Sequence, residues 1–255
     1  MSEHEAIVFT VRDGIAEIRV NRPAKMNAMD RPMYARITEL VHEIDSREDI
    51  AAAIVTGEGE RAFSAGADLV LYHSVDDEPE SWGPWHPDQW DFGVICTKPL
   101  IAAVNGHALA GGLELALLCD IRIASPNAQF GAAEAKWGLL GAMNTYLLPR
   151  TVGSALAMEM LLTGRSIGAQ QALAAGLVSR VVELDKLLAT AYDIAGAIRD
   201  NPAGGIAMTK ELAARGRNLS FEDHLRLSKA YYALASRSQE QHDGLATFRA
   251  NGARS

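Results

Sequence analysis

The pattern of apolar and polar positions predicts a chain that begins with strands and ends with helices. Residues 6–20 predict two short strands, because apolar positions flank an Asp-Gly turn signal. Residues 51–55 and 100–104 are apolar runs bounded by turn residues, which is typical of buried strands. Residues 30–44 have helical spacing of apolar side chains behind an Asp N-cap, which predicts a helix.

Beyond Gly141 the apolar spacing becomes mainly helical. The predicted helices, with a strand-like link at 177–182, cover 155–162, 167–176, 184–199, 202–214, 221–235 and 238–250. The shift to helices predicts two regions, a core over 1–195 and a helical C-terminal region over 196–255. We expect the second region to pack on the core, because no Pro- or Ser-rich linker separates them.

Composition narrows the class of protein. With 255 residues, 48% of them hydrophobic, the chain can bury a sizeable core. A formal net charge of −8 without a basic tract argues against nucleic acid as the main partner. Polar residues interrupt the longest apolar region, 100–124, so no membrane span is expected. Two cysteines exclude a disulfide-rich scaffold, and an N-terminus without a signal-peptide pattern predicts a cytoplasmic protein.

The segment from Lys98 to Gly141 holds the densest candidate chemistry. Ala110-Gly111-Gly112 lies at a predicted strand-to-helix junction, where free N–H groups suit an anion or an oxyanion. Glu114 follows about one turn into the helix, and Glu134 follows two strand-like runs at 121–124 and 129–131. Placing a carboxylate in apolar surroundings costs free energy, so these two acids are candidates for a functional role. From the residues alone, Glu114 could instead be a helix N-terminal charge and Glu134 an exposed loop acid.

Three blocks carry a resemblance to a known family. They read A-F-S-A-G-A-D-L from residue 62, A-A-V-N-G-H-A-L-A-G-G-L-E-L-A-L-L-C-D-I-R-I-A from residue 102, and A-Q-F-G-A-A-E from residue 128. In this order they resemble the enoyl-CoA hydratase/isomerase (crotonase) superfamily. The resemblance implies an α/β fold, a spiral of β-β-α repeats with a helical C-terminal region. It also implies an acyl-CoA thioester substrate, a place in fatty acid metabolism, and a homotrimer or homohexamer.

The resemblance also assigns roles to individual residues. The N–H groups of Ala67 and Gly111 would form an oxyanion hole. Glu114 would hold and activate water, and Glu134 would deliver or remove the proton on the α-carbon. The segment 22–28 matches the family's R-P-x-K-x-N-A loop along the CoA nucleotide, although it could equally be an ordinary connection. The predicted substrate-binding residues are Lys25, Asn27, Ala28, Ala65, Asp68, Leu69 and Gly141; Asp68 also fits a helix cap and is not expected to be catalytic.

The leading hypothesis is an enoyl-CoA hydratase, which adds water across the 2,3 double bond. Another crotonase-type enzyme, such as an isomerase, hydrolase or lyase, is the alternative, and a non-catalytic CoA-binding protein is a weaker one. No cofactor beyond the CoA of the substrate is expected, and no metal, because His73, His86 and His107 lack ligand spacing. Three tryptophans in the segment 82–90 could line the acyl pocket or anchor a surface loop.

The sequence departs from the family pattern in three places. After Glu134, hydratases often read G-x-x-P-G-A-G-G-T, whereas this chain reads G-L-L-G-A-M-N-T and has Met143 and Asn144 in place of the second glycine pair. Ala110 replaces the first glycine of a common G-G-G. Phe248 is followed by Arg249 where hydratases soon carry a lysine for the CoA 3′-phosphate. These departures leave the preferred acyl group and that phosphate contact open.

Overall fold

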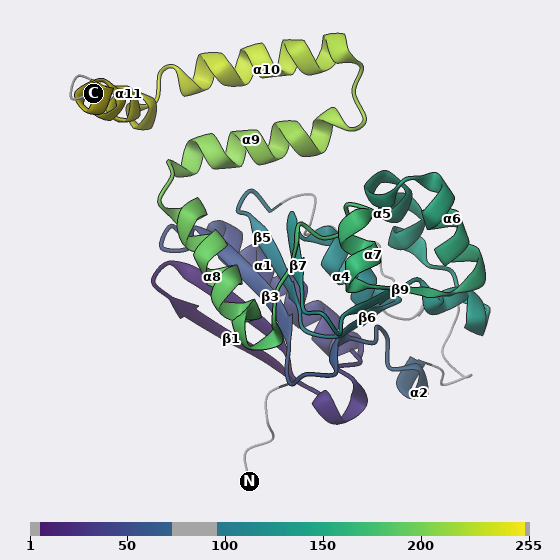
Figure 1. Ribbon diagram of the computed structural model, residues 1–255. Helices are drawn as coiled ribbons and strands as arrows, with labels where there is room; N and C mark the ends of the chain where they lie inside the picture. Colours follow the sequence, from purple (N-terminus) through teal and green to yellow (C-terminus); the bar gives the residue numbers. More distant parts are fainter. Residues whose placement is uncertain (1–5, 73–95, 253–255) are drawn as a thin grey trace.

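The computed structural model describes residues 6–72 and 96–252, and its core is built around a six-stranded sheet (Figure 1). The first two strands form the antiparallel hairpin that the Asp-Gly turn predicts, and each later strand is parallel to its neighbours. In spatial order the strands are β1 (Ile7–Arg12), β2 (Ile15–Val20), β3 (Ala52–Gly57), β5 (Leu100–Val104), β7 (Ile121–Ala124) and β10 (Arg180–Val181).

A smaller sheet of four strands completes each turn of the chain. Its order is β4 (Ala62–Ser64), β6 (His107–Leu109), β8 (Gln129–Gly131) and β9 (Ser166–Gly168). The first three strands are parallel, and β9 is antiparallel to β8. The pairs β3 and β4, β5 and β6, and β7 and β8 each place one strand in the large sheet and the next in the small one. This alternation confirms the expected spiral of β-β-α repeats.

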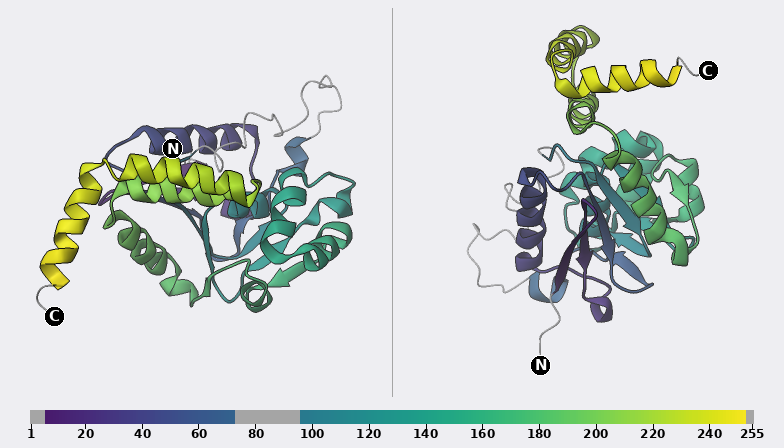
Figure 2. Two further views of the ribbon diagram at one scale, coloured as in Figure 1. Left: turned by 90° about the horizontal axis from the view of Figure 1, so that it is seen from above. Right: turned by 90° about the vertical axis from the view of Figure 1, so that its left-hand side faces the viewer.

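Helices cover both faces of the large sheet, as the right-hand view of Figure 2 shows. On one face, α1 (Arg31–Ser46) buries its apolar stripe, and the Asp30 carboxylate caps it by accepting from the Met33 N–H. On the other face, α8 (Leu184–Arg199) buries Leu187, Ala191 and Ala195, which are spaced by one turn. The position of α8 explains why its sequence has a single apolar stripe.

A different kind of helix lies in the interior. All residues of α4 (Gly111–Leu118) are buried, and every residue of this helix except Glu114 is apolar. The helix is apolar around its whole circumference because every side of it is buried. Further short helices complete the core: η1 (Pro23–Lys25), α2 (Leu69–Tyr72), η3 (Ala133–Trp137), α5 (Ala142–Val152), α6 (Ser154–Thr163) and α7 (Ala169–Ala174).

The last three helices stand away from the core (Figures 1 and 2). They are α9 (Ala203–Gly216), α10 (Phe221–Ala235) and α11 (Gln239–Gly252), and neither α9 nor α10 contains a buried residue. Lys210 fastens α9 to the core, because its Nζ lies 2.7 Å from Asp120 Oδ2 and 2.9 Å from the Lys98 carbonyl oxygen. Residue 195 lies within α8, and the division of the chain at that residue stays a prediction.

Several short strands were not expected from the sequence. The expected small-residue loop at 62–69 begins as β4, and the expected helix over 167–176 begins as β9, where Ile167 pairs with Phe130. Strands of three residues carry almost no periodic signal, and only a partner strand reveals them. Within residues 6–72 and 96–252, no helix has the length and apolar character needed to cross a bilayer.

Candidate active site

Three segments of the predicted site leave the same edge of the small sheet. Ala65 follows β4, Ala110 follows β6, and Ala132 follows β8. These three strands are parallel neighbours, so their carboxyl ends lie side by side. The spiral therefore brings together the three sequence blocks that are separated along the chain.

The two loops that hold the candidate oxyanion donors are in direct contact. A Cβ on Gly66 would lie 2.8 Å from the Gly111 nitrogen, and one on Gly112 would lie 2.0 Å from the Ser64 carbonyl oxygen. Such distances leave no room for a side chain, which explains the glycines here. The Ser64 hydroxyl further shapes the first loop by accepting from the Gly66 N–H at 3.1 Å.

Both candidate donors are left available by the local backbone pattern. The bridge between Met29 and Ala67 uses the N–H groups of Met29 and Asp68, and the N–H of Ala67 lies outside it. Gly111 is the first residue of α4, where N–H groups have no partner within the helix. The partial positive charge of a helix N-terminus adds to this donor.

Ala110 holds an uncommon backbone conformation beside this donor. Its backbone angle φ is +49°, a value that residues other than glycine rarely adopt. Its N–H donates to the Gly131 carbonyl at 2.8 Å, and its own carbonyl accepts from the Glu114 N–H. The surrounding hydrogen bonds thus hold a strained residue immediately before Gly111.

Glu114 points from α4 to the start of α5. Its side chain is fully buried, and Oε1 accepts from the N–H groups of Met143 at 3.1 Å and Asn144 at 3.3 Å. Burial, together with the nearby charge of Glu134, raises the Glu114 pKa to about 8, against the lowering effect of the two N–H donors. The predicted alternative of a simple helix N-terminal charge does not account for this enclosure.

Glu134 lies in η3 and is 5% exposed, so it is not an exposed loop acid. Its Oε1 accepts from Asn144 Nδ2 at 2.8 Å. Burial raises its pKa, and the hydrogen bond from Asn144 acts in the lowering direction. Gly141 lies against this carboxyl group, since a Cβ on Gly141 would lie 3.0 Å from both Cδ and Oε1.

Asn144 therefore contacts both carboxylates, one through its backbone and the other through its side chain. Sequence reasoning noted this residue only as a departure from the family pattern. The signal that could have pointed to it was a polar residue replacing glycine next to two buried acids. A fully buried asparagine needs partners, and buried carboxylates need donors.

The predicted CoA loop is tied to the oxyanion loop by charge. Lys25 Nζ lies 3.0 Å and an Arg22 guanidinium nitrogen 3.1 Å from Asp68 Oδ2. The Lys25 hydrogen bond and charge, with help from Arg22, lower the pKa of Asp68. The other Asp68 oxygen accepts from the Val70 N–H, which agrees with the expected cap of the following helix.

Other predicted substrate-binding residues divide into scaffold and surface positions. The Asn27 side chain is fully buried and binds the Arg22 N–H and the carbonyls of Glu58 and Ala62. Its side chain therefore shapes the loop. Ala28 and Ala65 also take part in the loop's backbone bonds, whereas Leu69 is 40% exposed at the start of α2. The tryptophan segment 82–90 lies outside the described residues.

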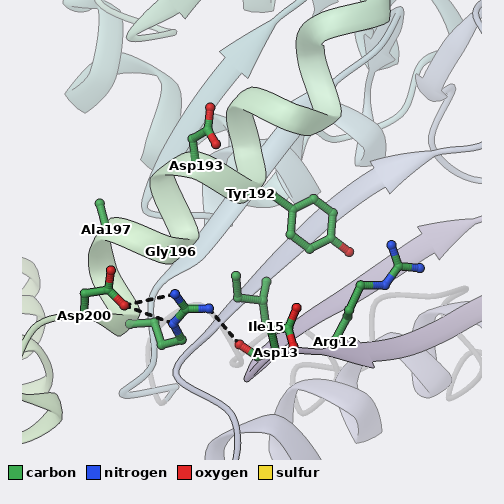
Figure 3. A pocket seen from close by; sticks show the side chains of 9 residues that line it. Arg12, Asp13, Ile15, Tyr192, Asp193, Gly196, Ala197 and Asp200 are labelled. Carbon is green, nitrogen blue, oxygen red and sulfur yellow. Dashed lines mark hydrogen bonds and ion pairs between the residues drawn. The ribbon is translucent and has the colours of Figure 1, made fainter.

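A separate surface pocket lies between the β1–β2 turn and α8 (Figure 3). Arg199 spans it by donating to the Asp13 carbonyl and pairing with Asp200. None of its lining residues belongs to the predicted site. In the part of the chain that the structure describes, no group of three or more His, Cys, Asp or Glu residues is arranged to hold a metal ion.

Comparison with known proteins agrees with this geometry. The family model described as enoyl-CoA hydratase/isomerase matches residues 10–252. The (E)-benzylidenesuccinyl-CoA hydratase of Thauera aromatica is 35% identical over 95% of each chain, and the short-chain-enoyl-CoA hydratase of Clostridium acetobutylicum is 34% identical over 95% of this chain and 94% of its own. A crystal structure of enoyl-CoA hydratase from Bacillus anthracis superposes with a TM-score of 0.90 at 30% identity, covering 97% of each chain. The chain belongs to the enoyl-CoA hydratase/isomerase family.

Proposed function

We propose that this protein is an enoyl-CoA hydratase that uses Glu114, Glu134 and a backbone oxyanion hole. The observation that carries the proposal is the pair of buried carboxylates, both bound to Asn144, at the sheet edge that also presents Ala67 and Gly111. A structural role alone gives no reason to bury two acids side by side, because their charges repel and no base among residues 6–72 and 96–252 pairs with either of them.

The oxyanion hole would act on the thioester carbonyl. When water adds to the β-carbon, negative charge develops on the carbonyl oxygen. Two N–H groups that are already aimed at that oxygen stabilise this charge without reorganisation, and removing one such donor typically costs about 3–4 kcal/mol. The N-terminus of α4 strengthens the Gly111 donor.

The two glutamates would carry out the proton transfers of the hydration reaction. Hydration breaks one O–H bond of water and the π bond between the α- and β-carbons, and it forms a C–O bond at the β-carbon and a C–H bond at the α-carbon. One carboxylate must accept a proton while the other group donates one. Two close, buried carboxyl groups whose pKa values are both raised can hold one proton between them at neutral pH. In the assignment we favour, Glu114 activates water and Glu134 exchanges the proton with the α-carbon. Although burial raises the pKa of Glu114 to about 8, the reactive form would be the one in which the shared proton lies on Glu134 and Glu114 is ionised.

The substrate would be an acyl-CoA thioester, with CoA as part of the substrate and no further cofactor. The loop 22–28 would lie along the CoA nucleotide. The thioester and the CoA phosphates would be bordered by Lys25, Ala65, Leu69 and Gly141. Relatives named for short-chain and for benzylidenesuccinyl substrates support a 2-enoyl thioester and leave a broad choice of acyl group. We also propose a cytoplasmic homotrimer or homohexamer, supported by the exposed apolar side chains of the C-terminal helices.

A spectroscopic assay tests this function directly. A conjugated enoyl thioester absorbs in the ultraviolet, and hydration removes the conjugation. Mixing the protein with a panel of enoyl-CoA esters should bleach this absorbance for at least one member, and the product should be the 3-hydroxyacyl ester. Binding without bleaching would favour a non-catalytic CoA-binding protein. Movement of the double bond without a hydroxylated product would favour an isomerase.

A further inference from the structure

The orientation of the Asn144 side chain is determined by its hydrogen bonds. Nδ2 donates to the Ala110 carbonyl at 3.1 Å and to Glu134 Oε1 at 2.8 Å, which uses both of its N–H bonds. The reversed amide would place Oδ1 against two acceptor oxygens, which is repulsive. Oδ1 must therefore point away from both partners and can only accept a hydrogen bond.

Three acceptor atoms around these side chains are buried without a protein donor. They are Asn144 Oδ1, Glu114 Oε2 and Glu134 Oε2, and none has a hydrogen-bond partner among the described residues. A buried polar atom without a partner is costly, and three such atoms on residues that Asn144 joins by hydrogen bonds point to a bound molecule. The occupant must bring hydrogen-bond donors into a site that already contains two carboxyl groups.

A single water matches this set when the glutamate pair holds one proton. The protonated carboxyl group donates to the water oxygen, and the two water hydrogens reach the other carboxylate and Asn144 Oδ1. All three oxygens are then satisfied, whichever glutamate carries the proton. The requirement resembles that of buried waters in general, which make about three hydrogen bonds.

We propose that Asn144 is a third polar group of the water site, where its amide N–H positions Glu134 and its amide oxygen accepts a hydrogen bond from the reacting water. This inference rests on the proposed hydration reaction and deepens it. The amide oxygen turns one lone pair of the water toward the β-carbon by holding one of its hydrogens.

A crystal structure of the wild-type protein at high resolution tests the water site without any assay. We expect a water within about 3.2 Å of Asn144 Oδ1 and of both glutamates. A water bound by the glutamates but beyond hydrogen-bond distance of Oδ1 would overturn the proposal. So would a water-free site in which Oδ1 has turned to a protein donor.

Kinetics of Asn144→Leu test the consequence for the reaction. Leucine keeps the size and removes both polar atoms, so kcat should fall by roughly ten- to a hundredfold, the usual worth of a hydrogen bond to a charged group. KM should change little. The Asn144 N–H favours ionised Glu134, so its loss should move the pH–rate limb that reports Glu134 to higher pH. Asn144→Asp, which also lacks the N–H donor, should move that limb in the same direction.

Thr145→Val serves as the matched control, because Thr145 is exposed on the same helix and its hydroxyl donates to the Ala142 carbonyl, away from both glutamates. It should keep the wild-type pH profile. A wild-type profile in both Asn144 variants would overturn the proposal, even if kcat falls through loss of stability. If the wild type hydrates no enoyl-CoA but the three-contact water is present, the proposed function fails and the Asn144 site stands.

Discussion

The ammonium group of Lys25 lies 3.0 Å from Asp68 Oδ2, and this ion pair joins the predicted CoA loop to the loop that presents Ala67. Asp68 is nearly buried, whereas Lys25 is about half exposed. In this arrangement, a phosphate bound by Lys25 would share the ammonium charge with Asp68. This relationship reduces the contribution that the sequence alone assigns to Lys25.

Lys25→Ala should weaken the binding of CoA esters only a few-fold, because a half-exposed charge contact is screened and worth about 1 kcal/mol or less. The effect should be larger at low ionic strength. Titration calorimetry with a saturated acyl-CoA at two salt concentrations measures it. Lys186→Ala removes the same charge from the exposed surface of α8 and should leave the affinity unchanged. Equal affinities for wild type and Lys25→Ala at low salt would remove Lys25 from the site.

Glu114→Gln and Glu134→Gln should each cut hydration by several powers of ten. Glutamine keeps the shape of the side chain but cannot exchange the proton, and loss of a general acid or base alone costs about 10²–10⁴-fold. The double variant should be little worse than either single one, because the pair acts as a unit. Affinity for a saturated acyl-CoA should survive in all three. If one substitution abolishes turnover and the other leaves it nearly intact, an isomerase-type site replaces the hydratase.

Stability should fall as the pH rises from about 4.5 to about 8, because Glu114 keeps its proton in the folded state over this range and loses it in the unfolded state. Below this range both states are protonated, and the stabilising difference is fully present. One such group contributes a slope of up to about 1.4 kcal/mol per pH unit. Urea unfolding at several pH values should show a flatter dependence for Glu114→Gln than for the wild type.

Glu48→Gln provides the control for this pH experiment, because Glu48 is exposed and distant in sequence from the carboxylate pair. Its free energy of unfolding should follow the wild-type dependence. Parallel curves for wild type and Glu114→Gln would show that Glu114 titrates normally in the folded protein.

Ala110 should tolerate glycine and reject a branched side chain. Ala110→Gly relieves the positive φ but adds freedom to the unfolded chain, and these effects of about 1 kcal/mol each offset one another. Ala110→Val should cost more than about 2 kcal/mol of unfolding free energy and lower kcat by moving the Gly111 N–H. Ala189→Val, on the exposed side of α8, should cost only the helix propensity difference of about 0.5 kcal/mol. Similar costs at both positions would argue against strain at Ala110.

The C-terminal helices should be covered in solution. Phe221, Tyr232 and Phe248 are each 70% or more exposed in the isolated chain, which is unusual for aromatic residues of a monomer. Sedimentation velocity at micromolar concentration should give a mass of three or six chains. Phe221→Glu should shift this distribution toward smaller species, whereas Glu222→Gln, an exposed neighbour, should leave it unchanged. A monomeric wild type would contradict the proposed assembly.

The sequence by itself determined the main elements and the two acids. The strand at 100–104 has its predicted bounds, and α8 was predicted at residues 184–199, because these segments have strong periodicity and clear ends. Glu114 and Glu134 could be singled out because acids in apolar surroundings are costly. The family blocks added their expected roles, and the matching family model agrees with that resemblance.

Only the tertiary structure decided how these pieces meet. The three-residue strands β4 and β6 were not expected from the sequence, whereas β8 at residues 129–131 was, and only the parallel pairing of all three aligns the ends from which the site is built. Asn144 looked like a replaced glycine, because nothing local to residue 144 indicates that its side chain reaches Glu134 and the Ala110 carbonyl. Spacing along one element records periodic burial, whereas hydrogen bonds between distant segments depend on how those elements pack, and packing follows from the whole chain at once.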